Sequence, residues 1–172
     1  GLVLAAVWAA GSSINDKRRT AEAGDELQII AQNILALKLG QGTLFSTSPA
    51  DITSNMISTK AIPQSYLSKS DATTADAPWG KGTLIVKSIG TRTFRIYFSS
   101  ASIQGCVGLL MQGTSCAVGN KGCPSAIYTR NDAYSLTPSA TQGWGNMTTQ
   151  QANTACKNGT SNTTSVAFEY SF

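Results

Sequence analysis

The sequence predicts an α+β fold in which one long N-terminal helix packs on an antiparallel β-sheet. Three observations lead to this class. Residues 1–39 contain no proline and place apolar residues at helical spacing, residues 83–99 have the composition of a β-hairpin, and the last residues alternate between apolar and polar. A helix followed by consecutive antiparallel strands is typical of α+β domains. The chain has 172 residues, so we expect a single domain over residues 1–172.

The N-terminal helix is expected over residues 1–39 and is amphipathic after about residue 14. Its apolar stripe contains Ile14, Leu27, Ile30, Ile34 and Leu37. The opposite face carries Arg18, Arg19, Glu22, Asp25, Glu26, Gln28 and Lys38, which we expect to be solvated or ion-paired. At 1.5 Å per residue the helix would be roughly 55 Å long, longer than such a domain is wide, so its first turns should project.

The start of this helix is apolar without a polar face. Its large apolar residues are Leu2, Val3, Leu4, Val7 and Trp8. A run of ten apolar residues is too short for a bilayer, which needs about 20, so we expect a longer helix that begins upstream of Gly1. Because a contiguous apolar stripe rarely stays exposed, we expect this end to enter a membrane and then pack among identical helices. Trp8 fits either a membrane-interface anchor or a packing residue in a helix bundle.

A polar connection follows Gly40. Residues 48–51 read as an N-cap, a proline at the first helical position and an acid in the first turn, which predicts a short helix to about Ser58. Residues 68–78 are small and polar and are expected to form an exposed loop. Residues 78–82 form a turn that leads into the sheet.

Two strands are expected at residues 83–89 and 91–99, joined across Gly90. In the second strand Phe94, Ile96 and Phe98 alternate with Arg95 and Tyr97, so one face should be buried and the other half-exposed.

The remaining chain alternates between irregular and regular segments. Residues 101–111 predict a short apolar helix, and residues 112–147 are expected to be mostly irregular with a strand near 126–130. Residues 148–156 have a helical pattern. From Val166 to Phe172 the alternation predicts a terminal strand.

The composition excludes several classes of function. Only 13% of the residues are charged, whereas Ser and Thr number 40, so the surface is rich in hydroxyl groups. The chain has no histidine, which removes the commonest general base and the usual non-thiolate zinc ligand. We therefore expect that the protein is not an enzyme and that it binds neither a metal ion nor a cofactor. The net charge of +4 includes no basic run longer than residues 17–19, so we expect no nucleic-acid partner.

Four cysteines, Cys106, Cys116, Cys123 and Cys156, lie in the last third of the chain. Their spacing does not resemble a zinc clip, and an even number in a small domain of this composition favours two disulfides in an oxidising compartment over free buried thiols. Spacing alone leaves three possible pairings open.

Four segments carry a family resemblance: residues 61–66 (AIPQSY), 78–80 (PWG), 104–107 (QGCV) and 148–157 (TTQQANTACK). Together with the order of elements, they make the chain resemble the type IVb pilins of enteric bacteria. The segments are similar to those of bundle-forming pilin. The chain as a whole resembles the PilS-type pilins of Salmonella thin pili and related conjugative plasmids.

The resemblance implies a division of the chain. Residues 1–39 would be the assembly helix, with Gly1 about a dozen residues into the mature pilin, residues 40–81 the αβ-loop, and residues 82–172 the sheet and D-region. In this family a disulfide bounds the D-region. It would join Cys106 to Cys156, which leaves Cys116 and Cys123 as a second pair.

The resemblance also implies a function. The chain would be the major pilin of a Gram-negative bacterium, held in the inner membrane with its domain in the periplasm until its N-terminal helix polymerises with identical subunits. The product would be an extracellular filament for adhesion, aggregation or mating contact, with a receptor on a host or bacterial surface. An alternative is a minor pilin or secreted adhesin domain that binds a ligand through residues 112–147.

Overall fold

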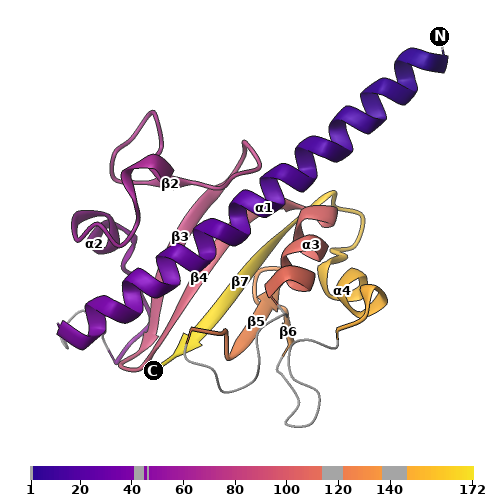
Figure 1. Ribbon diagram of the computed structural model, residues 1–172. Helices are drawn as coiled ribbons and strands as arrows, with labels where there is room; N and C mark the ends of the chain where they lie inside the picture. Colours follow the sequence, from indigo (N-terminus) through magenta and orange to yellow (C-terminus); the bar gives the residue numbers. More distant parts are fainter. Residues whose placement is uncertain (1, 41–44, 46, 114–121, 137–146) are drawn as a thin grey trace.

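The computed structural model describes the chain except residues 1, 41–44, 46, 114–121 and 137–146 (Figure 1). The helices are α1 (Leu2–Gly40), α2 (Thr53–Ser58), α3 (Ile103–Gly113) and α4 (Thr149–Cys156), with a 3₁₀ turn at Gln64–Tyr66. The strands are β1 (Ala50–Asp51), β2 (Ala75–Asp76), β3 (Thr83–Gly90), β4 (Thr93–Ser102), β5 (Ala126–Thr129), β6 (Tyr134–Leu136) and β7 (Thr163–Ser171).

These strands form one antiparallel sheet in the order β1-β3-β4-β7-β5-β6, and β2 pairs with the same edge of β3 as β1 does. The last strand of the chain, β7, therefore lies inside the sheet between β4 and β5. Helix α1 crosses one face of this sheet, with β2 and α2 on one side of the helix and α3 and α4 on the other (Figure 1). The predicted α+β class is confirmed.

The core lies between α1 and the sheet. The helix contributes Ala23, Leu27, Ile30, Ala31 and Ile34, all buried. The sheet contributes three fully buried phenylalanines, Phe94, Phe98 and Phe168, together with the aliphatic residues beside them. Full burial of such a side chain contributes roughly 1.5–3 kcal/mol, so this layer holds the C-terminal half of α1 in place.

The predicted hairpin and its alternation are confirmed, but the predicted connection across Gly90 was wrong. Gly90 pairs with Thr93, so Thr91 and Arg92 make the turn, and Phe94, Ile96 and Phe98 are completely buried. Arg95 and Tyr97 lie on the opposite face of the sheet and are partly exposed.

The helix predicted to begin at Pro49 instead begins at Thr53, so that prediction was wrong. Ala50 and Asp51 pair with Ser88 and Lys87 of β3 as strand β1. The Asp51 carboxylate then accepts hydrogen bonds from the Thr53 N–H at 2.9 Å and the Thr53 hydroxyl at 2.6 Å. Ala50 and Asp51 form a strand because the open edge of β3 offers them backbone partners. The local capping pattern contains no information about that edge.

The predicted exposed loop at residues 68–78 is also only partly correct. Ala75 and Asp76 form β2, and the Ala75 side chain is completely buried. Leu67 pairs with Ala75, so the exposed part is the turn between them. Strand β6 was not predicted, and α3 starts at Ile103 because β4 continues to Ser102.

Helix α4 agrees closely with the prediction for residues 148–156. Thr148 is its N-cap and forms a capping box with Gln151, in which each side chain accepts a hydrogen bond from the other residue's backbone N–H. This reciprocal pair satisfies two donors that a helix start would otherwise leave unpaired.

Candidate functional site

The candidate site for assembly is α1, whose contacts with the rest of the domain start at residue 16 among those the structure describes. The Ser102 hydroxyl donates to the Asp16 carboxylate at 3.1 Å, and the Arg19 guanidinium donates to the Trp79 carbonyl at 3.1 Å. Thr20 is buried, and apolar packing continues from there to Ile34. The first turns of α1 extend beyond the sheet (Figure 1).

The predicted assembly residues all fall in these first turns. The backbone of Leu2, Val3, Leu4, Val7, Trp8 and Ile14 is helical, and their side chains lie outside what the structure describes. Their role in assembly remains a prediction. Of the helices in the described residues, none has the length and apolar character that spanning a membrane requires.

Helix α3 lies close against α1 where Gly108 faces Thr20. A Cβ at Gly108 would come within 2.7 Å of the Thr20 Cγ2, so a larger residue there would push the two helices apart. Gly105 of the same helix faces Trp79 instead, where a Cβ would come within 2.5 Å of the Trp79 Nε1. The segment between β4 and β5 is thus held directly on α1.

A disulfide between Cys106 and Cys156 joins α3 to α4, with a Cα–Cα distance of 5.9 Å. Both cysteines are completely buried, and this is the pair that the family resemblance implies. Cys123 is also disulfide-bonded, whereas Cys116 lies outside the described residues, so the pairing of Cys116 with Cys123 remains a prediction.

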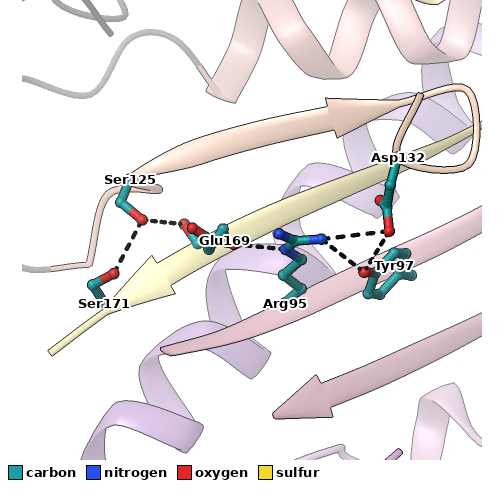
Figure 2. A network of polar contacts seen from close by, with 6 residues as sticks. All are labelled: Arg95, Tyr97, Ser125, Asp132, Glu169 and Ser171. Atoms are coloured by element: carbon teal, nitrogen blue, oxygen red, sulfur yellow. Dashed lines mark hydrogen bonds and ion pairs between the residues drawn. The ribbon is translucent and has the colours of Figure 1, made fainter. Parts of the chain in front are cut away.

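The face of the sheet away from α1 carries a polar network that the sequence analysis did not identify (Figure 2). Arg95 donates to the Glu169 carboxylate at 2.6 Å and also contacts Asp132 at 3.4 Å. Burial alone would lower the pKa of Arg95, but hydrogen bonds to Tyr97 and Glu169 outweigh it and raise the pKa. The Arg95 guanidinium also lies 3.6 Å from the ring centroid of Tyr128.

The same network supports an unusual turn after β5. Arg130, Asn131 and Asp132 all have positive φ angles, which non-glycine residues adopt only at a cost. The Asn131 N–H donates to the Ser165 hydroxyl at 2.6 Å, and the Tyr97 hydroxyl donates to Asp132 at 3.1 Å. These contacts compensate the strained backbone.

Glu26 contradicts the expectation of a solvated polar helix face. It is 8% exposed, and its Oε2 atom is fully shielded without a hydrogen-bond partner. Burial, followed by the charge of Glu22, raises the pKa of Glu26 to about 8. Glu26 is buried because of a tertiary contact: the segment around β2 covers this side of α1. The helical pattern of the sequence gives no information about that contact.

Glu26 lines a cavity of about 330 Å³ between α1 and the segment around β2. The other lining residues are Ser65, Tyr66, Leu67, Ser68, Lys69, Ser70, Asp76, Ala77 and Pro78. Most of these residues have polar side chains. In the part of the chain that the structure describes, no three His, Cys, Asp or Glu side chains are grouped to hold a metal ion.

Comparisons with known proteins agree with this architecture. The PilS N-terminal family model matches residues 17–169. No curated protein matches the chain. A type IVb pilin from Salmonella typhi aligns with a TM-score of 0.62 at 17% identity, covering 88% of this chain and 99% of that one.

The pilin TcpA from the El Tor biotype of Vibrio cholerae aligns with a TM-score of 0.54 at 14% identity, covering 90% of this chain and 99% of that one. At these identities the alignments show a shared fold, and the family match covers most of the chain. The chain therefore belongs to the PilS family and has the fold of the type IVb pilins.

Proposed function

We propose that this chain is the major subunit of a type IVb pilus, which polymerises through the N-terminal turns of α1. The observation that carries the proposal is the contrast along α1: residues from Asp16 onward are tied to the domain, whereas the preceding turns extend beyond it (Figure 1). Those turns contain the apolar residues Leu4 and Val7. An apolar helix end that projects from a folded domain is suited to packing among copies of itself.

In this proposal the domain stays in the periplasm, with the helix in the inner membrane, until assembly exports it as an extracellular filament. The filament then serves adhesion, bacterial aggregation or mating contact. The pilin fold is a structural one, and we propose that the chain has no enzymatic activity. The disulfide and the hydroxyl-rich surface suit a protein exposed outside the cell.

The test is Leu4→Asp or Val7→Asp in the full-length pilin, expressed with its pilus machinery. A charge buried among neighbouring helices is strongly unfavourable, so we expect surface filaments to disappear while the domain stays folded. Electron microscopy of the cells counts filaments, and circular dichroism of the isolated domain checks folding. Leu4→Ile is the matched control and should leave filaments unchanged.

Normal filament numbers in both aspartate variants would refute the proposal. The amount of the chain in sheared filaments separates a major from a minor pilin. A major subunit should be the most abundant protein in that fraction.

A further inference from the structure

Glu26 needs a partner that the isolated subunit does not provide. Its Oε2 atom is shielded from solvent, and among the residues that the structure describes Glu26 forms neither a hydrogen bond nor an ion pair. An unpaired buried polar group is unfavourable, and more so when it is charged. Native proteins satisfy such groups almost always, which makes the exception informative.

The groups around Glu26 do not neutralise it. Glu22 lies one helical turn before it and Asp25 precedes it directly. Across the cavity lie Tyr66 and Asp76, and Lys69 is the one cation among the lining residues. Lys69 forms no ion pair with Glu26. The cavity therefore presents an excess of acceptor and negative groups.

The cavity has room for an incoming side chain. A liquid water molecule occupies about 30 Å³. The cavity, at about 330 Å³, is many times larger. Ser65, Ser68 and Ser70 are among the lining residues, and serine hydroxyl groups can accept hydrogen bonds from an ammonium group.

A second copy of the chain can supply that ammonium group. A contact that repeats into an open filament joins two different faces of the subunit. The cavity lies on the β2 side of α1, whereas α4 lies on the opposite side (Figure 1). Lys157 follows α4 directly, is exposed, and makes no ion pair with the residues that the structure describes. It is also the single basic residue after Arg130.

We propose that the Glu26 cavity binds the ammonium group of a lysine from a neighbouring subunit, Lys157 being the donor, and that this pair locks adjacent subunits together in the filament. The inference rests on the proposed function, since it needs a filament. It assigns the buried carboxylate a role that exists only in the assembled state. In the free subunit, the buried Glu26 carboxyl favours its protonated, neutral form, and this lowers the cost of leaving it without a partner.

The first experiment is carbodiimide crosslinking of purified wild-type filaments, which joins a carboxylate directly to an adjacent amine. Mass spectrometry of the digested product should identify a peptide linking Glu26 to Lys157. Since the two residues lie on opposite sides of one subunit, the isolated domain treated in the same way should not give this peptide.

The second experiment compares Glu26→Gln and Lys157→Gln with Asp25→Asn. The control removes a negative charge from the exposed neighbour of Glu26 on the same helix. We expect at least a tenfold reduction of intact filaments after mild heating in either glutamine variant, with the control unchanged. A tenfold change corresponds to about 1.4 kcal/mol. Each isolated domain should still fold, as judged by circular dichroism.

Wild-type filaments that give no Glu26 to lysine crosslink, together with Glu26→Gln filaments as resistant as the wild type, would overturn this inference and leave the proposed function intact. Absence of filaments from the wild-type chain would instead refute the proposed function itself.

Discussion

At the scale of single residues, Glu26 and Arg95 are two charged groups held in different environments, Glu26 beside α1's own packing and Arg95 on the face of the sheet away from α1. Arg95 and Glu169 are directly opposite each other on β4 and β7, and each side chain is 15% exposed. Their charges are paired at 2.6 Å. Glu26 is buried to a similar degree and lacks such a partner among the described residues. A buried pair can persist ionised at neutral pH, but a buried single carboxyl favours its neutral form.

The domain should lose stability as pH rises because of Glu26. Its pKa is about 8 when folded, against an ordinary value of 4.5. The contribution of Glu26 protonation to the free energy of unfolding is therefore complete below about pH 4.5 and is lost as pH rises to about 8. A pKa difference of this size corresponds to a loss on the order of 5 kcal/mol. Urea unfolding of the isolated domain at pH 5, 7 and 9 measures it.

Glu26→Gln is expected to reduce this pH dependence and to raise the free energy of unfolding at pH 9. The other groups that face Glu26 from packed elements, Tyr66, Lys69 and Asp76, remain in place in that variant, as does Glu22 on α1. Asp25→Asn should keep the wild-type profile. Identical profiles for the wild type and Glu26→Gln would contradict the prediction.

At the scale of elements, α3 and α4 are held by two different means. Gly108 lets α3 approach α1 closely, whereas α4 is joined to α3 through the Cys106–Cys156 disulfide. The sequence separation of the bridge is 50 residues. The capping box at Thr148 adds local stability to α4 but does not connect it to anything else.

Replacing both Cys106 and Cys156 with alanine should lower the free energy of unfolding by about 4 kcal/mol, since a loop of this length loses that much closure entropy. Urea unfolding under non-reducing conditions measures the effect. Thr148→Ala, which removes only the helix cap, is the matched comparison and should cost about 1 kcal/mol. Equal losses in the two variants would show that the disulfide does not constrain the unfolded chain as expected.

At the scale of the whole molecule, the described contacts of α1 with the domain begin only after its first turns (Figure 1). The first described contacts of α1 with other elements are made by Asp16 and Arg19. The core layer begins at Ala23. A subunit built this way can change the packing of its first turns during assembly without unfolding its domain.

Removal of residues 1–14 should therefore shift the melting temperature of the isolated domain by less than about 2 °C, since roughly 1 kcal/mol corresponds to 2–4 °C for a chain of this size. Removal of residues 1–24 deletes Asp16, Arg19, Thr20 and Ala23 as well and should lower it by several degrees. Differential scanning calorimetry compares the two. A large shift after the shorter deletion would mean that the first turns contribute to the domain's own core.

The sequence by itself determined the parts of this protein that depend on neighbours along the chain. Helical spacing predicted the C-terminal end of α1 to within one residue, and alternation predicted the buried faces of β4 and β7. The helical pattern of residues 148–156 predicted α4, and the capping box at its start is a local feature of the same kind. The family resemblance was carried by short segments of the same kind.

Only the tertiary structure decided what depends on elements distant in sequence. The edge of β3 turned Ala50 and Asp51 into a strand in place of a helix start. The position of β7 between β4 and β5 brought Glu169 beside Arg95, 74 residues away. The segment around β2 covered Glu26, which its helical position places among exposed charges. Strand pairing and burial are set by long-range contacts, and a periodic pattern describes only which face of an element is apolar.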